Sequence, residues 1–268
     1  MLYTLKGLVL RETVANDNAK YINLLTAERG RIPVLVRGST RHRGHFSVPT
    51  QIFCYSEFVL YENHGKYTLN DASLIENYFY LCEDFDRMTL GTYILNTAEY
   101  VSNEEQPEEA LLKLALNTLW VLSHPKGKDL RLIKGAYELR LASIAGFAPN
   151  LAYCRSCGKG VSDFSDGTTF YLNVMGGHFL CPDCKNKLAE ENFAENDLPV
   201  DRDRMAQIIL PLSPAAVLAM QYVLYVEPSR LFSFTLAEEV IPSFSSACEK
   251  YLENHVDHHF QVLDLLTL

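Results

Sequence analysis

Four of the seven cysteines in this 268-residue sequence form two C-x-x-C pairs, the strongest sign of chemistry in the chain. Cys154 and Cys157 make the first pair, which Gly158 follows directly, and Cys181 and Cys184 make the second. Two such turns at the ends of a hairpin place four thiolates around one zinc ion in the tetrahedral arrangement that zinc prefers. Because the protein would supply all four ligands and leave no position for a substrate water, we expect one structural zinc ion.

Two other uses of paired cysteines fit the sequence less well. A thioredoxin-type redox site has a single C-x-x-C at the start of a helix in a βαβ unit, and neither feature is evident. Zinc-dependent nucleobase deaminases carry H-x-E upstream of P-C-x-x-C, and no H-x-E occurs in this chain. The scattered thiols of Cys54, Cys82 and Cys248 are expected to be buried apolar side chains.

No motif of an enzyme active site is evident. The sequence contains no H-E-x-x-H, Walker loop, Gly-x-Ser-x-Gly or dinucleotide-binding fingerprint. His255 and His259 are spaced i, i+4 with Asp257 between them, so a hydrolase with a second metal ion stays an alternative, although no fourth ligand is apparent. We therefore predict a protein that is not an enzyme.

Positive charge is concentrated in the first part of the chain, although the whole sequence has a net charge of −9. Residues 1–75 hold 9 Lys and Arg against 6 Asp and Glu, whereas residues 76–153 hold 7 against 11 and residues 154–268 hold 8 against 16. Residues 29–56 contain no acidic side chain but five arginines, whose local positive field can attract the phosphates of a nucleic acid: Arg29, Arg31, Arg37, Arg41 and Arg43. Nearby aromatic residues offer stacking surfaces for bases, namely Tyr3, Phe53, Tyr55, Phe58, Tyr61 and Tyr67. A solvated loop beside core aromatics is the alternative interpretation.

The first 76 residues are typical of a small β-barrel. Runs rich in Val, Ile, Leu, Tyr and Thr are separated by turn residues and predict strands over 2–12, 19–28, 31–37, 53–62 and 66–76. Five short strands in about 75 residues favour an OB-fold, although an SH3-like barrel has a similar pattern.

The period of the apolar residues changes to that of helices after residue 76. Helices are predicted over 85–101, 107–124, 129–145 and 215–226, with a further helix from about residue 244. A hairpin is predicted through 170–174 and 178–180, between the cysteine pairs. The predicted fold is therefore α+β, with an OB-fold at 1–76, a helical body at 77–152 and 186–268, and a zinc ribbon inserted at 153–185.

The N-terminus lacks the basic and apolar regions of a signal peptide, and the most apolar segment, 111–122, is too short to span a bilayer. We expect a cytoplasmic protein without membrane contacts.

The order of these parts resembles that of the RecO family of bacterial recombination-mediator and DNA repair proteins. The resemblance covers essentially the whole chain and includes KGLVLRE, AKYINLLTAERGRIPVLVRGSTR and LGTYILNTAEYV. Its most specific part is GAYELRLASIAGFAPNLAYCRSCG, in which an aromatic-Glu-Leu helix leads through Gly-Phe-Ala-Pro to the first cysteine pair. The resemblance implies an N-terminal OB-fold, a helical body and a zinc ribbon set into it, with no catalytic residues.

The resemblance also implies partners. RecO proteins bind single- and double-stranded DNA, anneal complementary strands and, with RecR, help to load RecA onto DNA coated by the single-stranded DNA-binding protein. Carried over by position, the four paired cysteines are the zinc ligands, and Arg37, Arg41 and Arg43 are the foremost DNA contacts. The third predicted helix carries the densest cations of the acidic body, and we expect these to receive the acidic tail of the single-stranded DNA-binding protein: Lys128, Arg131 and Lys134. A zinc-stabilised scaffold whose barrel binds protein or RNA is the alternative function.

Overall fold

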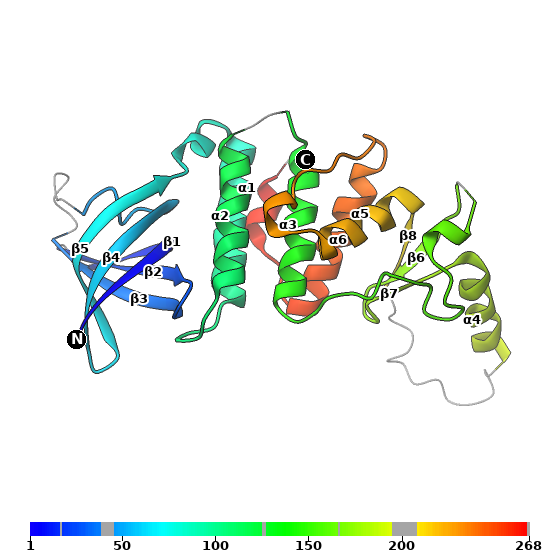
Figure 1. Cartoon of the computed structure of the whole chain (residues 1–268), viewed down its shortest axis with the longest axis horizontal. Helices are drawn as coiled ribbons and strands as arrows, with labels where there is room; N and C mark the ends of the chain where they lie inside the picture. The colour runs from blue at the N-terminus through cyan, green and yellow to red at the C-terminus, as the bar shows by residue number, and fades with distance from the viewer. Residues whose placement is uncertain (17, 39–45, 125–126, 166, 195–207, 267–268) are drawn as a thin grey trace. The chain divides into compact units, whose positions relative to one another are not determined.

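The computed structural model describes residues 1–16, 18–38, 46–124, 127–165, 167–194 and 208–266 (Figure 1). The chain forms two compact units, here called unit 1 (Met1–Gly127 with Phe260–Leu268) and unit 2 (Lys128–His259). No helix within the described residues is long and apolar enough to cross a membrane. The division into an OB-fold, a helical body and an inserted zinc ribbon, which was expected from the sequence, stays a prediction.

Unit 1 begins with a closed five-stranded barrel. Its strands are β1 (Leu2–Asn16), β2 (Ala19–Thr26), β3 (Gly30–Arg37), β4 (Cys54–Asn63) and β5 (Lys66–Asn77). They close in the order β1-β2-β3-β5-β4, with β3 and β5 parallel and the other pairs antiparallel. All five strands predicted from the sequence are confirmed, and the barrel is that of the expected OB-fold.

Strand alternation builds the barrel interior. On β2 and β3 the inward residues are fully buried, as Ile22, Leu24, Ile32 and Val34 show, and their neighbours point outward. Phe58 of β4 is also fully buried in the same core. Burying these apolar side chains favours the closed barrel by about 1.5–3 kcal/mol for each large residue.

The rest of unit 1 is helical. Its elements are η1 (Phe79–Glu83), α1 (Phe85–Val101), α2 (Glu109–Ser123) and η5 (Gln261–Leu265). Asp84 begins α1 as an N-cap, with its side chain accepting a hydrogen bond from the Arg87 backbone N–H. The C-terminal segment packs on α1 through Phe260, whose ring lies edge-to-face with Tyr93 at 5.5 Å between centroids and with Tyr100 at 5.6 Å.

One helix of unit 2, α3 (Leu130–Ile144), is buried on nearly every side. The helices α5 (Pro214–Tyr225), η4 (Pro228–Arg230) and α6 (Ile241–Val256) belong to the same unit. Every residue of α3 from Leu132 to Leu139 is buried. Gly135 allows the close approach of α3 to α6, because a Cβ there would lie 2.8 Å from Cε1 of the buried Phe244.

A small sheet completes unit 2. It is built from β6 (Phe170–Asn173), β7 (His178–Leu180) and β8 (Ile209–Leu212), with η2 (Val161–Asp163) before it and α4 (Pro182–Ala194) after β7. The predicted hairpin of β6 and β7 is confirmed, and β8 adds a third antiparallel strand on the other side of β6. The expected α+β fold, with an N-terminal five-stranded barrel, helices and a four-cysteine cluster, is therefore confirmed.

Candidate metal centre and nucleic-acid interface

The two cysteine pairs form two tight turns beside the β6–β7 hairpin. In the first, the N–H of Gly158 donates to the carbonyl of Cys154 at 2.9 Å, and Gly158 adopts a φ of +74°, which favours glycine. The N–H of Arg155 donates to the carbonyl of Phe179 at 3.0 Å and ties this turn to β7. The second turn opens α4, where the N–H of Lys185 donates to the carbonyl of Cys181 at 3.0 Å. These turns bring together cysteines that are 24 or more residues apart across the two pairs.

The four thiols fit a tetrahedral metal ion. The Sγ atoms of Cys154, Cys157, Cys181 and Cys184 all lie within 4.8 Å of one another, and those of Cys157 and Cys181 are 3.8 Å apart. Tetrahedral ligands with a Zn–S length of about 2.3 Å have sulfurs about 3.8 Å apart. The cluster could therefore hold one metal ion, with all four ligand positions filled by protein.

Backbone N–H groups aimed at the sulfurs suit thiolate ligands. The N–H of Cys181 donates to Sγ of Cys154 at 3.3 Å. Burial alone would raise the pKa of Cys154, but N–H donors from Cys157, Cys181 and Ser156 outweigh it and lower this pKa to about 7. Burial raises the pKa of Cys181 to about 12. A metal cation would favour the deprotonated form of every thiol in the cluster.

Two of the five predicted DNA-binding arginines join the barrel to the segment between α1 and α2. The guanidinium of Arg29 lies 2.8 Å from the hydroxyl of Tyr67, 3.1 Å from Glu105 and 4.4 Å above the ring of Tyr3. Arg31 pairs with Glu104 at 3.0 Å, and its N–H donates to the Asn103 carbonyl at 2.9 Å. These contacts hold the β2–β3 turn against the segment between α1 and α2, so both arginines have structural partners.

Arg37 differs from these two because it is exposed at the end of β3 and has no ion pair within the described part of the chain. Arg41 and Arg43 lie outside the described residues. Arg37 shares the outer barrel face with Tyr21 and Leu35, since Tyr21 pairs with Leu35 and Ala19 pairs with Arg37. Tyr21 is 47% exposed, and its diagonal position brings an aromatic ring and a cation within reach of one ligand.

Tyr21 was absent from the aromatic residues picked out in the sequence, although strand alternation could have found it, because Ile22 and Leu24 on either side of Asn23 point inward. Three of the residues that were picked out are core residues, namely Phe53, Phe58 and Tyr67. Tyr61 is 50% exposed on β4. Further along the face that carries Tyr21, the side chain of Asn23 donates to Glu99 of α1 at 2.5 Å, so this end of the face is covered.

The alternative metal site at the C-terminal end of α6 is not assembled. His255 contacts the Tyr251 carbonyl through Nδ1 at 2.9 Å, whereas Nδ1 of His259 contacts Glu253 at 2.7 Å. The four cysteines form the only group of three or more potential ligands found among the described residues.

Comparison with known proteins identifies the family. The family model "Recombination protein O N terminal" matches residues 1–78, and "Recombination protein O C terminal" matches residues 82–264. The chain belongs to the RecO family. It is 28% identical to the DNA repair protein RecO of Acetivibrio thermocellus over 260 residues, which cover 97% of this chain and 94% of that protein. The RecO of Symbiobacterium thermophilum is 33% identical over 69% of this chain and 72% of its own length, and that of Bacillus pumilus is 27% identical over 97% and 90%. The resemblance inferred from the sequence is confirmed, and membership of this family supports a role in DNA repair and recombination.

The three cations that were expected to receive an acidic tail have different environments. Lys134 is only 5% exposed, and its ammonium contacts Glu138 at 2.9 Å and Glu249 at 2.5 Å. Arg131 is paired with the N-cap residue Asp129, whose pKa is lowered by this hydrogen bond. Lys128 has no ion pair among the described residues and is partly exposed. Binding an acidic tail needs an accessible ammonium. The expectation for Lys134 is therefore corrected, because helix α3 is buried at this position.

Proposed function

We propose that this RecO-family chain is a non-enzymatic recombination mediator that binds single- and double-stranded DNA and anneals complementary strands. With RecR it would assist the loading of RecA onto strands covered by the single-stranded DNA-binding protein. Family membership supports the general role, and the finer steps are part of this proposal. The proposal also places the protein in the cytoplasm, and at the nucleoid during repair.

The DNA-binding surface of this proposal is the outer face of β2 and β3 at the end away from α1. On this face Arg37 is exposed and has no ion pair within the described residues. Tyr21 lies diagonal to it on β2. The sequence places Arg41 and Arg43 only four and six positions beyond Arg37. Phosphate contacts from such arginines bind DNA of any sequence, and an exposed tyrosine adds stacking on unpaired bases. The diagonal placement of the exposed Arg37 and Tyr21 on one face of the barrel is the observation that carries this proposal.

We also propose that the cysteine cluster binds one zinc ion per chain with a structural role. The support is the thiol geometry, which matches four-sulfur zinc coordination and leaves no open ligand position. Its four ligands bring the first turn, β7 and the start of α4 together, so the ion would stabilise the ribbon.

The proposed partner site for the acidic tail is reduced to Lys128 and Arg131 at the start of α3. Arg131 already has Asp129 as a partner, and an incoming carboxylate would compete with it. The surface that meets RecR has no assigned residues in this proposal.

The proposal is tested by DNA binding of the full chain across a salt series. The double substitution R41E/R43E should weaken binding to single and double strands of any sequence. Losing two phosphate contacts should flatten the dependence of log affinity on log salt by about 1.8 units on duplex and about 1.4 on single strands. Lys66→Glu is the matched control, because Lys66 is exposed on the barrel at the β4–β5 turn rather than at the end of β3. An unchanged slope in folded R41E/R43E protein would remove this loop from the DNA site.

The alternative function is a zinc-stabilised scaffold whose barrel binds protein or RNA without annealing DNA. The ion pairs of Arg29 and Arg31 favour it in one respect, since they show that part of the basic segment has a structural task. Binding of RNA in preference to DNA of the same sequence would support the scaffold.

A further inference from the structure

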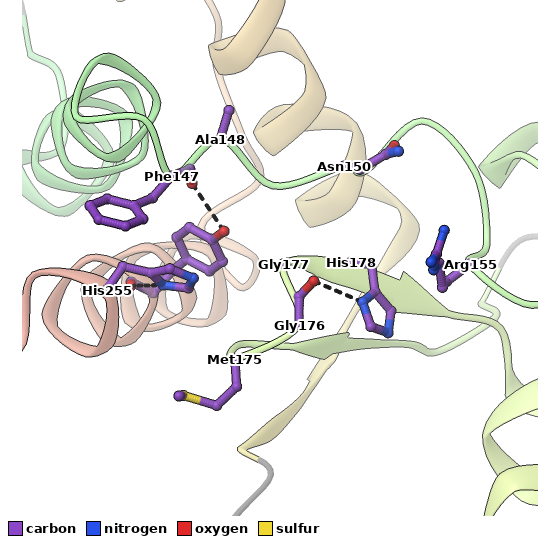
Figure 2. A pocket seen from close by; sticks show the side chains of 10 residues that line it. Phe147, Ala148, Asn150, Arg155, Met175, Gly176, Gly177, His178 and His255 are labelled. Atoms are coloured by element: carbon purple, nitrogen blue, oxygen red, sulfur yellow. Dashed lines mark hydrogen bonds between the residues drawn. The ribbon is translucent and has the colours of Figure 1, made fainter.

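Unit 2 contains an open pocket of about 500 Å³ that none of the roles above uses. Its walls come from the segment after α3, the first cysteine turn, the β6–β7 turn and α6 (Figure 2). Two hydrogen bonds hold these walls. The Tyr251 hydroxyl donates to the Phe147 carbonyl at 3.0 Å, and the N–H of Asn150 donates to the Gly177 carbonyl at 2.7 Å. Gly177 also lets the turn approach α6 closely, because a Cβ there would lie 2.9 Å from the Tyr251 hydroxyl. The pocket is therefore preformed.

The charge of the pocket is opposite to that of the chain. Ten residues line it, and they include one arginine and two histidines but no carboxylate, whereas the chain as a whole has a net charge of −9. Arg155 is exposed and has no side-chain partner in the described structure. His178 and His255 each contact a backbone carbonyl through Nδ1 at 2.9 Å, and a neutral ring that donates this hydrogen bond from Nδ1 presents Nε2 as an acceptor. This lining suits a ligand that carries both an anionic group and hydrogen-bond donors.

The same pocket has an apolar side. Phe147 is 42% exposed and Met175 is 56% exposed, and both line the pocket with the ring of His255 close to Phe147, at 5.5 Å between centroids. An exposed aromatic ring and a thioether line one side of the pocket and an arginine lines the other (Figure 2), which suits an unpaired strand because a base can stack and a phosphate can pair with the cation.

We propose that this pocket binds a segment of an unpaired DNA strand, with a base on Phe147 and Met175 and a phosphate of the strand at Arg155. The inference rests on the proposed DNA-binding function and adds a second, strand-selective contact on unit 2. A paired base cannot enter, because it is stacked inside the duplex and leaving the stack costs free energy.

The test compares the affinity of the full chain for a thymidine 20-mer and for a 20-base-pair duplex by fluorescence anisotropy. Arg155→Ala and Phe147→Ala should each weaken binding to the single strand by about fivefold or more and change duplex binding by less than about twofold. Phe147→Tyr keeps the ring and should retain the wild-type affinity. Lys159→Ala is the matched control, because Lys159 is exposed in the same cysteine-turn segment but lies near the Phe164 ring and does not line the pocket. Thermal unfolding checks that each variant is folded.

Photo-crosslinking gives a second readout. A thymidine strand with one 5-iododeoxyuridine should crosslink to a peptide containing Phe147 or Met175, and Arg155→Ala should reduce this product. The inference is wrong, and the barrel proposal stands, if Arg37→Glu weakens DNA binding while the pocket variants behave like Lys159→Ala. Equal losses of affinity for both DNA forms, or crosslinks confined to the barrel, would also overturn it. So would an acidic peptide that binds in the pocket and leaves the affinity for single-stranded DNA unchanged. A wild-type protein that binds no DNA would contradict both proposals.

Discussion

Replacing Lys134 by methionine should destabilise unit 2 strongly, because it leaves a buried carboxylate without its counter-charge. Glu138 is fully buried, and the Lys134 ammonium lies 2.9 Å from it. Burial lowers the pKa of Lys134, but Glu138 and Glu249 outweigh this effect and raise it, so the ammonium is charged in the folded protein. Methionine keeps the length of the apolar stem and removes the charge.

Removing one partner of a buried ion pair costs about 3–5 kcal/mol, and we expect a loss in this range for K134M. The loss of the ion pair with the second carboxylate, Glu249, should add little to this destabilisation, because the Glu249 side chain is 37% exposed and water can solvate it. The double variant K134M/E138L should recover much of the stability, because apolar replacement of both partners removes the unpaired charge. K128M is the control and should change the free energy of unfolding by less than about 0.5 kcal/mol.

Hydrogen exchange of the α3 amides, read by mass spectrometry, measures this loss locally. K134M should lower the opening free energy of α3 peptides, whereas K128M should leave it near wild type. Equal exchange in K134M and K128M would refute the reasoning, and so would a double variant no more stable than K134M.

Three further predictions concern the metal, the helix contact and alkaline pH. Protein purified without chelator should hold one zinc ion per chain by elemental analysis, and Cys157→Ser should lose it and exchange faster at the β6 and β7 amides while the barrel stays protected; wild-type protein without zinc would contradict this. Gly135→Ala should lower the melting temperature, because the new Cβ would meet Phe244 at 2.8 Å and overpacking costs about 1–3 kcal/mol; an unchanged or higher value would show that the ring can move. Burial, helped by the hydrogen bond to Glu105, raises the pKa of Tyr67 to about 12. This stabilisation is complete below the unfolded pKa of about 10 and is lost as pH rises toward 12, so melting temperatures at pH 9 and 11.5 should differ less in Tyr67→Phe than in wild type, and equal differences would exclude the effect.

Local patterns were enough to predict most elements of this fold. The five barrel strands follow from alternating apolar residues between turn signals, and α1 was predicted with the bounds it has, 85–101. The strand β8 was not predicted, since it is four residues long, contains Pro211 and depends on pairing with β6 across the chain.

The assembly of the cysteine cluster could also be predicted, because C-x-x-C turns have a fixed geometry and the hairpin between them brings their ends together. The environment of single charges could not. Arg29 and Arg31 meet Glu105 and Glu104, which lie more than 70 positions away, and no local pattern encodes such pairs.

Lys134 was misjudged for a related reason. Lys134 and Glu138 are four residues apart, a spacing that is typical of an exposed helix surface. In α3 the same pair is buried, because α5 and α6 pack around the helix, and this tertiary packing is not visible in the local sequence.

Strand annealing by the purified full chain tests the central claim most directly. Two complementary single strands, each labelled for energy transfer, should form duplex faster with the protein than without it, and the acceleration should fall as salt rises. The variant Arg37→Glu should anneal more slowly than wild type, whereas Lys66→Glu should match wild type. Annealing at the protein-free rate in wild type, or equal rates in wild type and Arg37→Glu, would contradict the proposal that this barrel face brings DNA strands together.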